Sequence, residues 1–134
     1  MGAQLAAGNK SRVFCIAGDG GFGYHVGEIE TALRYGLPVI VLLLNNSSLS
    51  FEYHIQKILY KDIVPAANDF LDVDYSAVAR AFGAFGENIT SSEEVRPALN
   101  RALESDKLAV LNFRTNKEIY APVIYYEGVE DRQV

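Results

Sequence analysis

The chain has 134 residues, enough for a single domain that buries about two-thirds of the surface of its unfolded form. Hydrophobic residues make up 49% of it, which excludes a disordered chain, and the longest apolar run, residues 37–44, is too short to span a bilayer. Acidic residues outnumber basic ones by 17 to 12 and there is no Lys/Arg cluster, so we expect neither nucleic acid nor a membrane as a partner.

The one cysteine, Cys15, lies inside an apolar strand pattern, and we expect it to be a buried and inert thiol. A single cysteine cannot form an internal disulfide, which fits a reducing compartment. The N-terminus lacks the basic and then apolar pattern of a signal peptide. We therefore expect a cytoplasmic protein.

The first half of the chain has the pattern of a strand, a helix and a second strand. Residues 1–7 are expected to form the end of a helix that stops at Gly8, and residues 13–17 to form a short apolar strand. A helix then extends to Gly36, and residues 39–44 form a second strand that is apolar on both faces. Such a unit has parallel strands and a right-handed crossover.

The second half continues the alternation of helices and strands. We expect a helix over residues 50–60, a loop over residues 64–72, and a helix that Asp74 caps and Gly83 ends. A short strand over residues 84–89 follows.

The last helix begins at a capping box formed by Ser91 and Glu94, although Pro97 would remove one of its hydrogen bonds and leaves its boundary open. Residues 108–113 form the last strand, and residues 115–134 form a C-terminal tail. This order of elements predicts an α/β fold, a three-layer αβα sandwich with a mostly parallel central sheet.

The turn after the first strand matches the glycine fingerprint of dinucleotide-binding sites, GxGxxG, at residues 18–23. That kind of site also needs an acidic residue at the end of the next strand, where this chain has Asn45 and Asn46. The turn itself carries Asp19, whose charge would repel a pyrophosphate unless a cation lay between them. Both departures favour a metal-bridged diphosphate over NAD.

The expected geometry supports a metal site. Neighbouring parallel strands place their carboxyl ends at one crevice, so Asp19 can face Asn45 and Asn46. A carboxylate, an amide oxygen, a backbone carbonyl, two phosphate oxygens and a water would complete the octahedral oxygen set that Mg²⁺ prefers. Gly20 and Gly21 would let the backbone approach the phosphate closely.

The same stretch resembles the thiamine diphosphate-binding, C-terminal domain of the acetolactate synthase-like and benzaldehyde lyase-like enzymes. The motif of that family is GDG followed by NN, present here at residues 18–20 and 45–46. Residues 74–84 also resemble the segment that follows the cofactor loop in these enzymes. The resemblance covers most of the chain and predicts a single thiamine diphosphate-binding domain over residues 1–134.

The resemblance implies that Asp19 and Asn46 are side-chain ligands of Mg²⁺ and that Ser48 supplies a backbone carbonyl ligand. Asn45 would lie beside the site. No catalytic residue of this chain is implied. The implied cofactor-binding residues are Gly18, Asp19, Gly20, Gly21, Asn45, Asn46 and Ser48.

Members of this family usually have three domains, and the resemblance implies that this chain holds only the last one, truncated at its N-terminus. The aminopyrimidine-binding domain, which supplies the activating glutamate, would have to come from elsewhere. We therefore expect the diphosphate- and Mg²⁺-binding part of a lyase or transferase that acts on 2-keto or 2-hydroxy acid type substrates. It would need a partner domain, either in a homo-oligomer or in an assembly with a chain that carries that domain.

Two other functions stay open. One is a non-catalytic remnant or interaction module with the same fold, and the other is a nucleotide-binding module of Rossmann or flavodoxin type. The two histidines, His25 and His54, are too far apart along the chain to form a zinc site. We expect His25 to be solvated and Glu28 to have a structural place on its helix. His54 lies beyond the Asn pair, in the region where related enzymes have a mobile loop over the cofactor.

Overall fold

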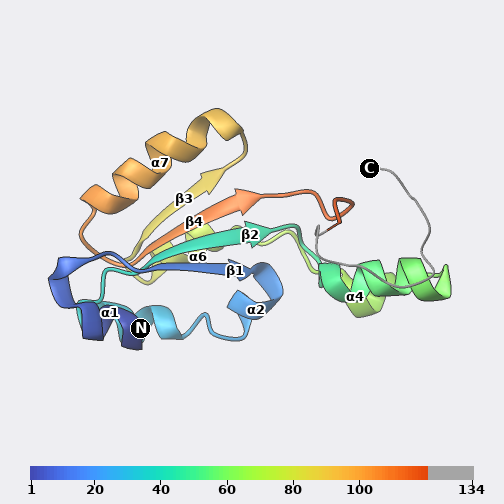
Figure 1. Ribbon diagram of the computed structural model, residues 1–134, viewed down its shortest axis with the longest axis horizontal. Coiled ribbons are helices and arrows are strands. Elements are labelled where there is room, and N and C mark those ends of the chain that lie inside the picture. The colour runs from blue at the N-terminus through green and yellow to red at the C-terminus, as the bar shows by residue number, and fades with distance from the viewer. Residues whose placement is uncertain (121–134) are drawn as a thin grey trace.

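The computed structural model describes residues 1–120, which contain one four-stranded sheet with the strand order β1-β2-β4-β3. Every strand pair is parallel, and the four arrows in Figure 1 point the same way. The predicted α/β fold with a parallel sheet is therefore confirmed. The strands are β1 (Phe14–Gly18), β2 (Ile40–Asn45), β3 (Phe85–Ile89) and β4 (Ala109–Arg114).

Helices lie on both faces of the sheet, as Figure 1 shows. The first face carries α2 (Asp19–Gly23), α3 (Glu28–Arg34) and α6 (Tyr75–Ala81), and the second carries α7 (Ser92–Glu104). The handedness of crossovers explains this division. The chain moves across the sheet in one direction from β1 to β2 to β3 and then back to β4, so a right-handed connection must place α7 on the opposite face.

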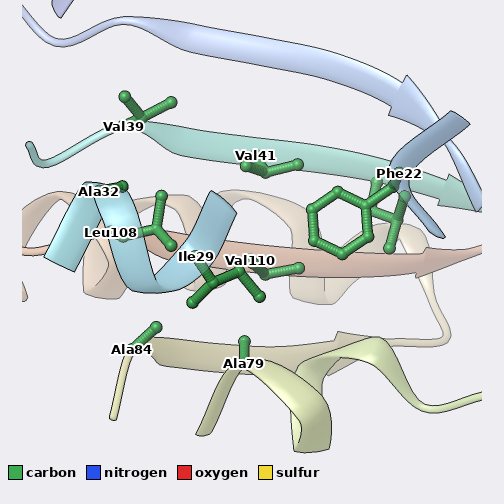
Figure 2. Close-up of a cluster of buried hydrophobic side chains, with 10 residues drawn as sticks. Phe22, Ile29, Ala32, Val39, Val41, Ala79, Ala84, Leu108 and Val110 are labelled. Carbon is green, nitrogen blue, oxygen red and sulfur yellow. The ribbon is translucent and has the colours of Figure 1, made fainter. Parts of the chain in front are cut away.

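The main apolar core lies between the sheet and the helices of the first face. Figure 2 shows Phe22 of α2 and Ile29 of α3 beside Val41 and Val110 of the two central strands. The ring of Phe22 also meets the edge of the Tyr75 ring, with centroids 5.5 Å apart. This packing fixes α2 against the end of β1, which is the part of the fold that carries Asp19.

The remaining helices lie near the two ends of the strands. Figure 1 shows α2 and α4 beyond the arrowheads, at the carboxyl ends, so the segments that follow β1 and β2 meet at this edge of the sheet. These remaining elements are α1 (Gly2–Ala7), the 3₁₀-helix η1 (Gly8–Lys10), α4 (Ser50–Ile55), the π-helix η2 (Gln56–Tyr60) and α5 (Pro65–Asn68).

The helix predicted to run up to Gly36 is interrupted. Its two parts, α2 and α3, are separated by residues 24–27, where the amide of His25 donates to the carbonyl of Phe22 and that of Glu28 to the carbonyl of His25. These hydrogen bonds join residues three apart, which is typical of turns rather than of a continuous α-helix. The glycines at 23 and 27 favour such a break because glycine has a low helix propensity. Gly36 itself ends α3 as predicted, with φ of 59°.

Several other boundaries differ slightly from prediction. Each strand of the structure begins one residue later than predicted, and each except β3 also ends one residue later. The predicted loop over residues 64–72 contains the one-turn helix α5. Asp74 does cap α6, and Ser91 and Glu94 do form the capping box, with Pro97 accommodated inside α7. Of the predicted tail, residues 121–134 lie outside the described part of the chain.

The prediction that Cys15 is buried is wrong, because β1 forms an edge of the sheet and Cys15 is exposed. On the second face of the sheet, α7 covers β3 and β4 and leaves β1 open. As a result, Phe14 and Ile16 are 46% and 71% exposed. In residues 1–120, no helix combines the length and the apolar character needed to cross a membrane.

Candidate functional site

Asp19 lies where β1 meets α2, and its side chain is withdrawn from solvent. The residue is 3% exposed. Its Oδ1 accepts a hydrogen bond from the amide of Gly20 at 2.9 Å, while Oδ2 has no hydrogen-bond partner in the described part of the chain. A carboxylate can stay ionised away from water only when donors or cations surround it. The free oxygen of Asp19 therefore marks a place that suits a cation.

The loop after β2 presents further oxygen atoms. Asn46 Oδ1 accepts a hydrogen bond from the amide of Ser48 at 3.2 Å, and Asn46 Nδ2 donates to the hydroxyl of Ser50. The carbonyl oxygen of Ser48 has one long contact, 3.5 Å from the same hydroxyl. Since carbonyl and amide oxygens have two lone pairs each, both retain capacity to ligate a metal ion.

This loop is held in place by a neighbouring segment. Ser48 pairs with Asp69 in an isolated antiparallel bridge. On either side of it, the amide of Leu49 donates to the carbonyl of Asn68 and the amide of Phe70 to the carbonyl of Ser47, both at 2.8 Å. The loop is thus fixed by backbone hydrogen bonds rather than by its own side chains alone.

A groove of about 380 Å³ lies at the carboxyl ends of β1 and β2. Six of the seven predicted cofactor-binding residues line it, so residues of the GDG turn and of the loop after β2 border one cavity. The lining residues are Ile16, Ala17, Gly18, Asp19, Gly20, Gly21, Leu44, Asn46, Ser48, Leu49, Ser50, Phe51 and Glu52.

Asn45, the seventh predicted residue, does not line this groove. Its side chain is buried in the sheet, where Nδ2 donates to the carbonyl of Val73 at 2.9 Å and to Oδ1 of Asn112 at 3.0 Å. It directly precedes Asn46, which lines the groove, and a contact of Asn45 with the cofactor stays a prediction. Asn112 was not predicted, although a single asparagine in an otherwise apolar strand is a signal that could have drawn notice.

The two glycines of the turn differ in what surrounds them. A Cβ on Gly20 would lie 2.7 Å from Cδ2 of Leu49 and 3.1 Å from the ring of Phe70, so a larger residue there would require these side chains to shift. A Cβ on Gly21 would meet no atom within 4 Å. The backbone at Gly21 is therefore open to the groove and available to a ligand.

The charges in the groove are acidic. Asp19 and Glu52 line it, and no lysine, arginine or histidine is among the lining residues. Burial raises the pKa of Tyr75, and the nearby negative charge of Asp19 raises it further. A diphosphate would be repelled by such a site unless a divalent cation lay between the phosphate and Asp19. Within residues 1–120 no three His, Cys, Asp or Glu side chains gather around one point, so the ion would draw its other ligands from amide and carbonyl oxygens.

The histidines have no part in this groove. His25 lies exposed in the turn between α2 and α3. His54 is 3% exposed, its Nε2 donates to the carbonyl of Lys117 at 2.7 Å, and its ring packs against Tyr120 at 4.4 Å between centroids. Glu28 lies exposed in the first turn of α3. None of these three residues is among those that line the groove.

Comparison with known families shows what the chain is similar to. Residues 1–113 match the family model described as the C-terminal TPP-binding domain of thiamine pyrophosphate enzymes. The large subunit of acetolactate synthase isozyme 2 from Escherichia coli is 35% identical over 106 residues, which are 79% of this chain and 19% of the relative. Oxalyl-CoA decarboxylase from the same organism is 34% identical over 113 residues, 84% of this chain and 19% of the relative.

A solved structure has the same fold. The thiamine diphosphate-dependent 4-hydroxybenzoylformate decarboxylase of Rhodococcus jostii superposes with a TM-score of 0.78 at 30% identity, over 86% of this chain and 21% of that one. The chain spans about a fifth of the length of the curated relatives it matches, 19% in each case given above.

Proposed function

The chain belongs to the family of C-terminal, thiamine pyrophosphate-binding domains of thiamine pyrophosphate enzymes, and we propose from this premise that it holds the diphosphate of the cofactor through Mg²⁺. Asp19 and Asn46 would ligate the ion with their side chains, and Ser48 with its backbone carbonyl. Gly18, Gly20 and Gly21 would bring the backbone to the diphosphate.

One observation carries this proposal: Oδ2 of Asp19 is buried without a hydrogen-bond partner in the described part of the chain, and Asp19 lines the same groove as Asn46 and Ser48. Burying an ionised carboxylate is unfavourable, and a divalent cation is the partner that would offset this and at the same time attract a diphosphate. An oxygen-only ligand set of this kind suits Mg²⁺ better than a transition metal.

Thiamine diphosphate, when bound, supplies an electron sink for breaking or forming a bond next to a carbonyl. The residues of this chain would bind and orient the diphosphate end, while the activating glutamate would come from an aminopyrimidine-binding domain, in a homo-oligomer or in another chain. The named relatives include a synthase of acetolactate and decarboxylases of oxalyl-CoA and 4-hydroxybenzoylformate. Their chemistry favours a lyase or transferase acting on 2-keto or 2-hydroxy acid type substrates. The single cysteine supports a location in the reducing cytoplasm.

Thermal unfolding with ligands tests the proposal. Thiamine diphosphate with Mg²⁺ at a hundred times its dissociation constant should stabilise the chain by about 2.7 kcal/mol, which raises Tm by several degrees. Each component alone should give a much smaller shift, because the anion and the ion bind as a pair.

The same experiment separates the alternatives. NAD and flavin mononucleotide serve as controls for a nucleotide-binding module. A shift with either of these and none with thiamine diphosphate and Mg²⁺ would reject the metal-bridged site. No shift with any of them would favour a non-catalytic module with the same fold.

A further inference from the structure

Three asparagine side chains form a line across the sheet at its carboxyl end, one strand after another. Asn88 of β3 and Asn112 of β4 are paired in register, and Asn112 Nδ2 donates to Asn88 Oδ1 at 2.7 Å. Asn45 Nδ2 of β2 then donates to Asn112 Oδ1 at 3.0 Å. Asn45 and Asn112 are almost wholly buried, whereas Asn88 lies at the exposed rim. We call this line the asparagine relay.

The relay has a direction, because an amide presents a donor on one side and an acceptor on the other. With Asn112 Nδ2 directed to Asn88, its Oδ1 must face Asn45. Asn45 Nδ2 is in turn engaged by Asn112 and by the carbonyl of Val73, so its Oδ1 is left to accept from the amide of Ser47 at 3.1 Å. A half-turn of the Asn112 amide would set two NH₂ groups against each other in a buried place, which is unfavourable.

The last hydrogen bond of the relay shapes the loop that follows β2. Ser47 has a φ of 57°, a left-handed conformation that residues other than glycine adopt only with support. The bond from its amide to Asn45 Oδ1 gives that support. Ser47 lies between Asn46 and Ser48, so its backbone conformation determines how these two residues are presented to the groove.

We propose that Asn112 and Asn88 are positioning residues for the candidate metal loop: through Asn45 they hold Ser47 in its left-handed conformation and so set the places of Asn46 and Ser48. The inference rests on the proposed function for its effect on Mg²⁺ binding. The inference goes beyond the proposed function because neither Asn112 nor Asn88 lines the groove. Their effect is exerted through hydrogen bonds from β4 and β3.

The first test compares Asn112→Leu with Asn112→Asp. Leucine removes the acceptor for Asn45, and the apparent affinity for Mg²⁺, titrated at saturating thiamine diphosphate, should fall about tenfold, the equivalent of one buried hydrogen bond. Aspartate keeps an acceptor toward Asn45 but loses the donor toward Asn88, so it should bind Mg²⁺ less tightly than the parent chain and more tightly than the Asn112→Leu chain. Val110→Ala is the matched control, since it destabilises the same strand without touching the relay.

Equal Mg²⁺ affinity in the Asn112→Leu and Val110→Ala chains would overturn the proposal. Asn88→Ala provides a milder change at the exposed end of the relay, and should weaken Mg²⁺ binding in the same direction even if Asn112→Leu does not fold. A loss of affinity in Asn112→Asp as large as in Asn112→Leu would also count against the relay. It would show that the oxygen at residue 112 that accepts from Asn45 has no effect on Mg²⁺ binding.

The second test needs no ligand. Hydrogen exchange at the Ser47 amide of the free chain should become about tenfold faster in Asn112→Leu or Asn88→Ala, because the bond to Asn45 opens more often. Val110→Ala should leave the local exchange of this amide unchanged. A parent chain without Mg²⁺-dependent binding overturns the proposed function alone, and the Ser47 exchange rate then decides whether the relay shapes the loop.

Discussion

Asp19 illustrates a conflict between stability and binding within one residue. In the free chain its Oδ2 is buried without a partner, and an unpaired buried polar atom destabilises a fold by about 1–3 kcal/mol. The fold tolerates this because the rest of the residue is well placed, with Oδ1 bonded to the amide of Gly20. Sites that bind charged ligands commonly carry such a local defect, which the ligand then corrects.

The substitution Asp19→Asn should therefore act in opposite directions in the free and the bound chain. It keeps an acceptor for the Gly20 amide and removes the buried charge, so the free chain should unfold at the same or a slightly higher temperature. The rise in Tm that Mg²⁺ and thiamine diphosphate cause together should be lost. Thermal unfolding with and without both ligands measures each effect, and a variant that keeps the full ligand-induced rise would show that Asp19 is not a ligand.

Sequence reasoning at this scale relied on residue types that have a narrow set of uses. Asp19, the glycines of the turn and Asn46 were predicted from their types and their positions at strand ends, and Ser48 was implied by the family resemblance. All of them line one groove in the structure. The side-chain direction of Asn45 was not predictable, because it depends on Asn112 and Val73, which are distant in sequence. Long-range contacts of this kind leave no local pattern.

At the scale of elements, side-chain capping marks where α6 and α7 begin. The carboxylate of Asp74 accepts hydrogen bonds from the amides of Ser76 and Ala77 at 2.9 and 3.1 Å and so starts α6. Burial by itself would raise the pKa of Asp74, but these bonds, that of the Ser76 hydroxyl and the charge of Arg80 outweigh it, and the pKa is lowered. A group with a lowered pKa stabilises the fold above its unfolded pKa, and this stabilisation is lost as the pH falls through the folded pKa.

It follows that Asp74→Ala should lower the free energy of unfolding by about 1 kcal/mol at neutral pH. The difference from the parent chain should shrink as the pH falls below the unfolded pKa of about 3.9 and on through the lower pKa of the folded state, where the parent's Asp74 becomes protonated. Urea unfolding across this pH range measures both. Asp106→Asn, at a surface ion pair with Arg12, is the control for a general loss of negative charge, and a penalty for Asp74→Ala that stays constant with pH would contradict the capping account.

The elements also show why His54 has no place in the groove. Residues that follow β4 fold back onto α4 and η2, where Glu118 accepts hydrogen bonds from the hydroxyl of Tyr53 at 2.6 Å and from Lys57 at 2.7 Å. His54 is buried under this segment and bonded to the carbonyl of Lys117. The sequence predicts a helix at residues 50–60 but contains no signal that a later segment of the chain packs against it. His54 and Lys117, which form the hydrogen bond, are 63 residues apart in sequence.

At the scale of the whole molecule, the two edges of the sheet are unlike each other. The outer strand β3 carries Glu87, which forms an ion pair with Arg101 of α7, and charges of this kind discourage pairing with other strands. The other edge, β1, has the sequence FCIAG, with no charged residue and with Phe14 and Ile16 exposed. Cys15 was predicted to be buried because its neighbours are apolar, and periodicity alone cannot tell a central strand from an edge.

The apolar edge predicts self-association of the chain through β1. If two copies pair along this edge, Cys15 becomes less accessible, so its reaction with a thiol reagent under native conditions should slow as the protein concentration rises. Ile16→Lys places a charge on the exposed face of the edge and should abolish this concentration dependence while leaving the thiol reactive. Sedimentation velocity should show the same change as a loss of the larger species.

The replacement at residue 16 is informative because it separates association from unfolding. Ile16 is 71% exposed, so lysine there removes little buried surface, and Tm at low protein concentration should stay within a few degrees of the parent value. Lys107→Glu is the control. It changes a charge just before the amino end of β4, away from the β1 edge, and should leave association unchanged. Equal association in the parent and Ile16→Lys chains, with Cys15 equally reactive at all concentrations, would place any self-contact on a surface other than β1.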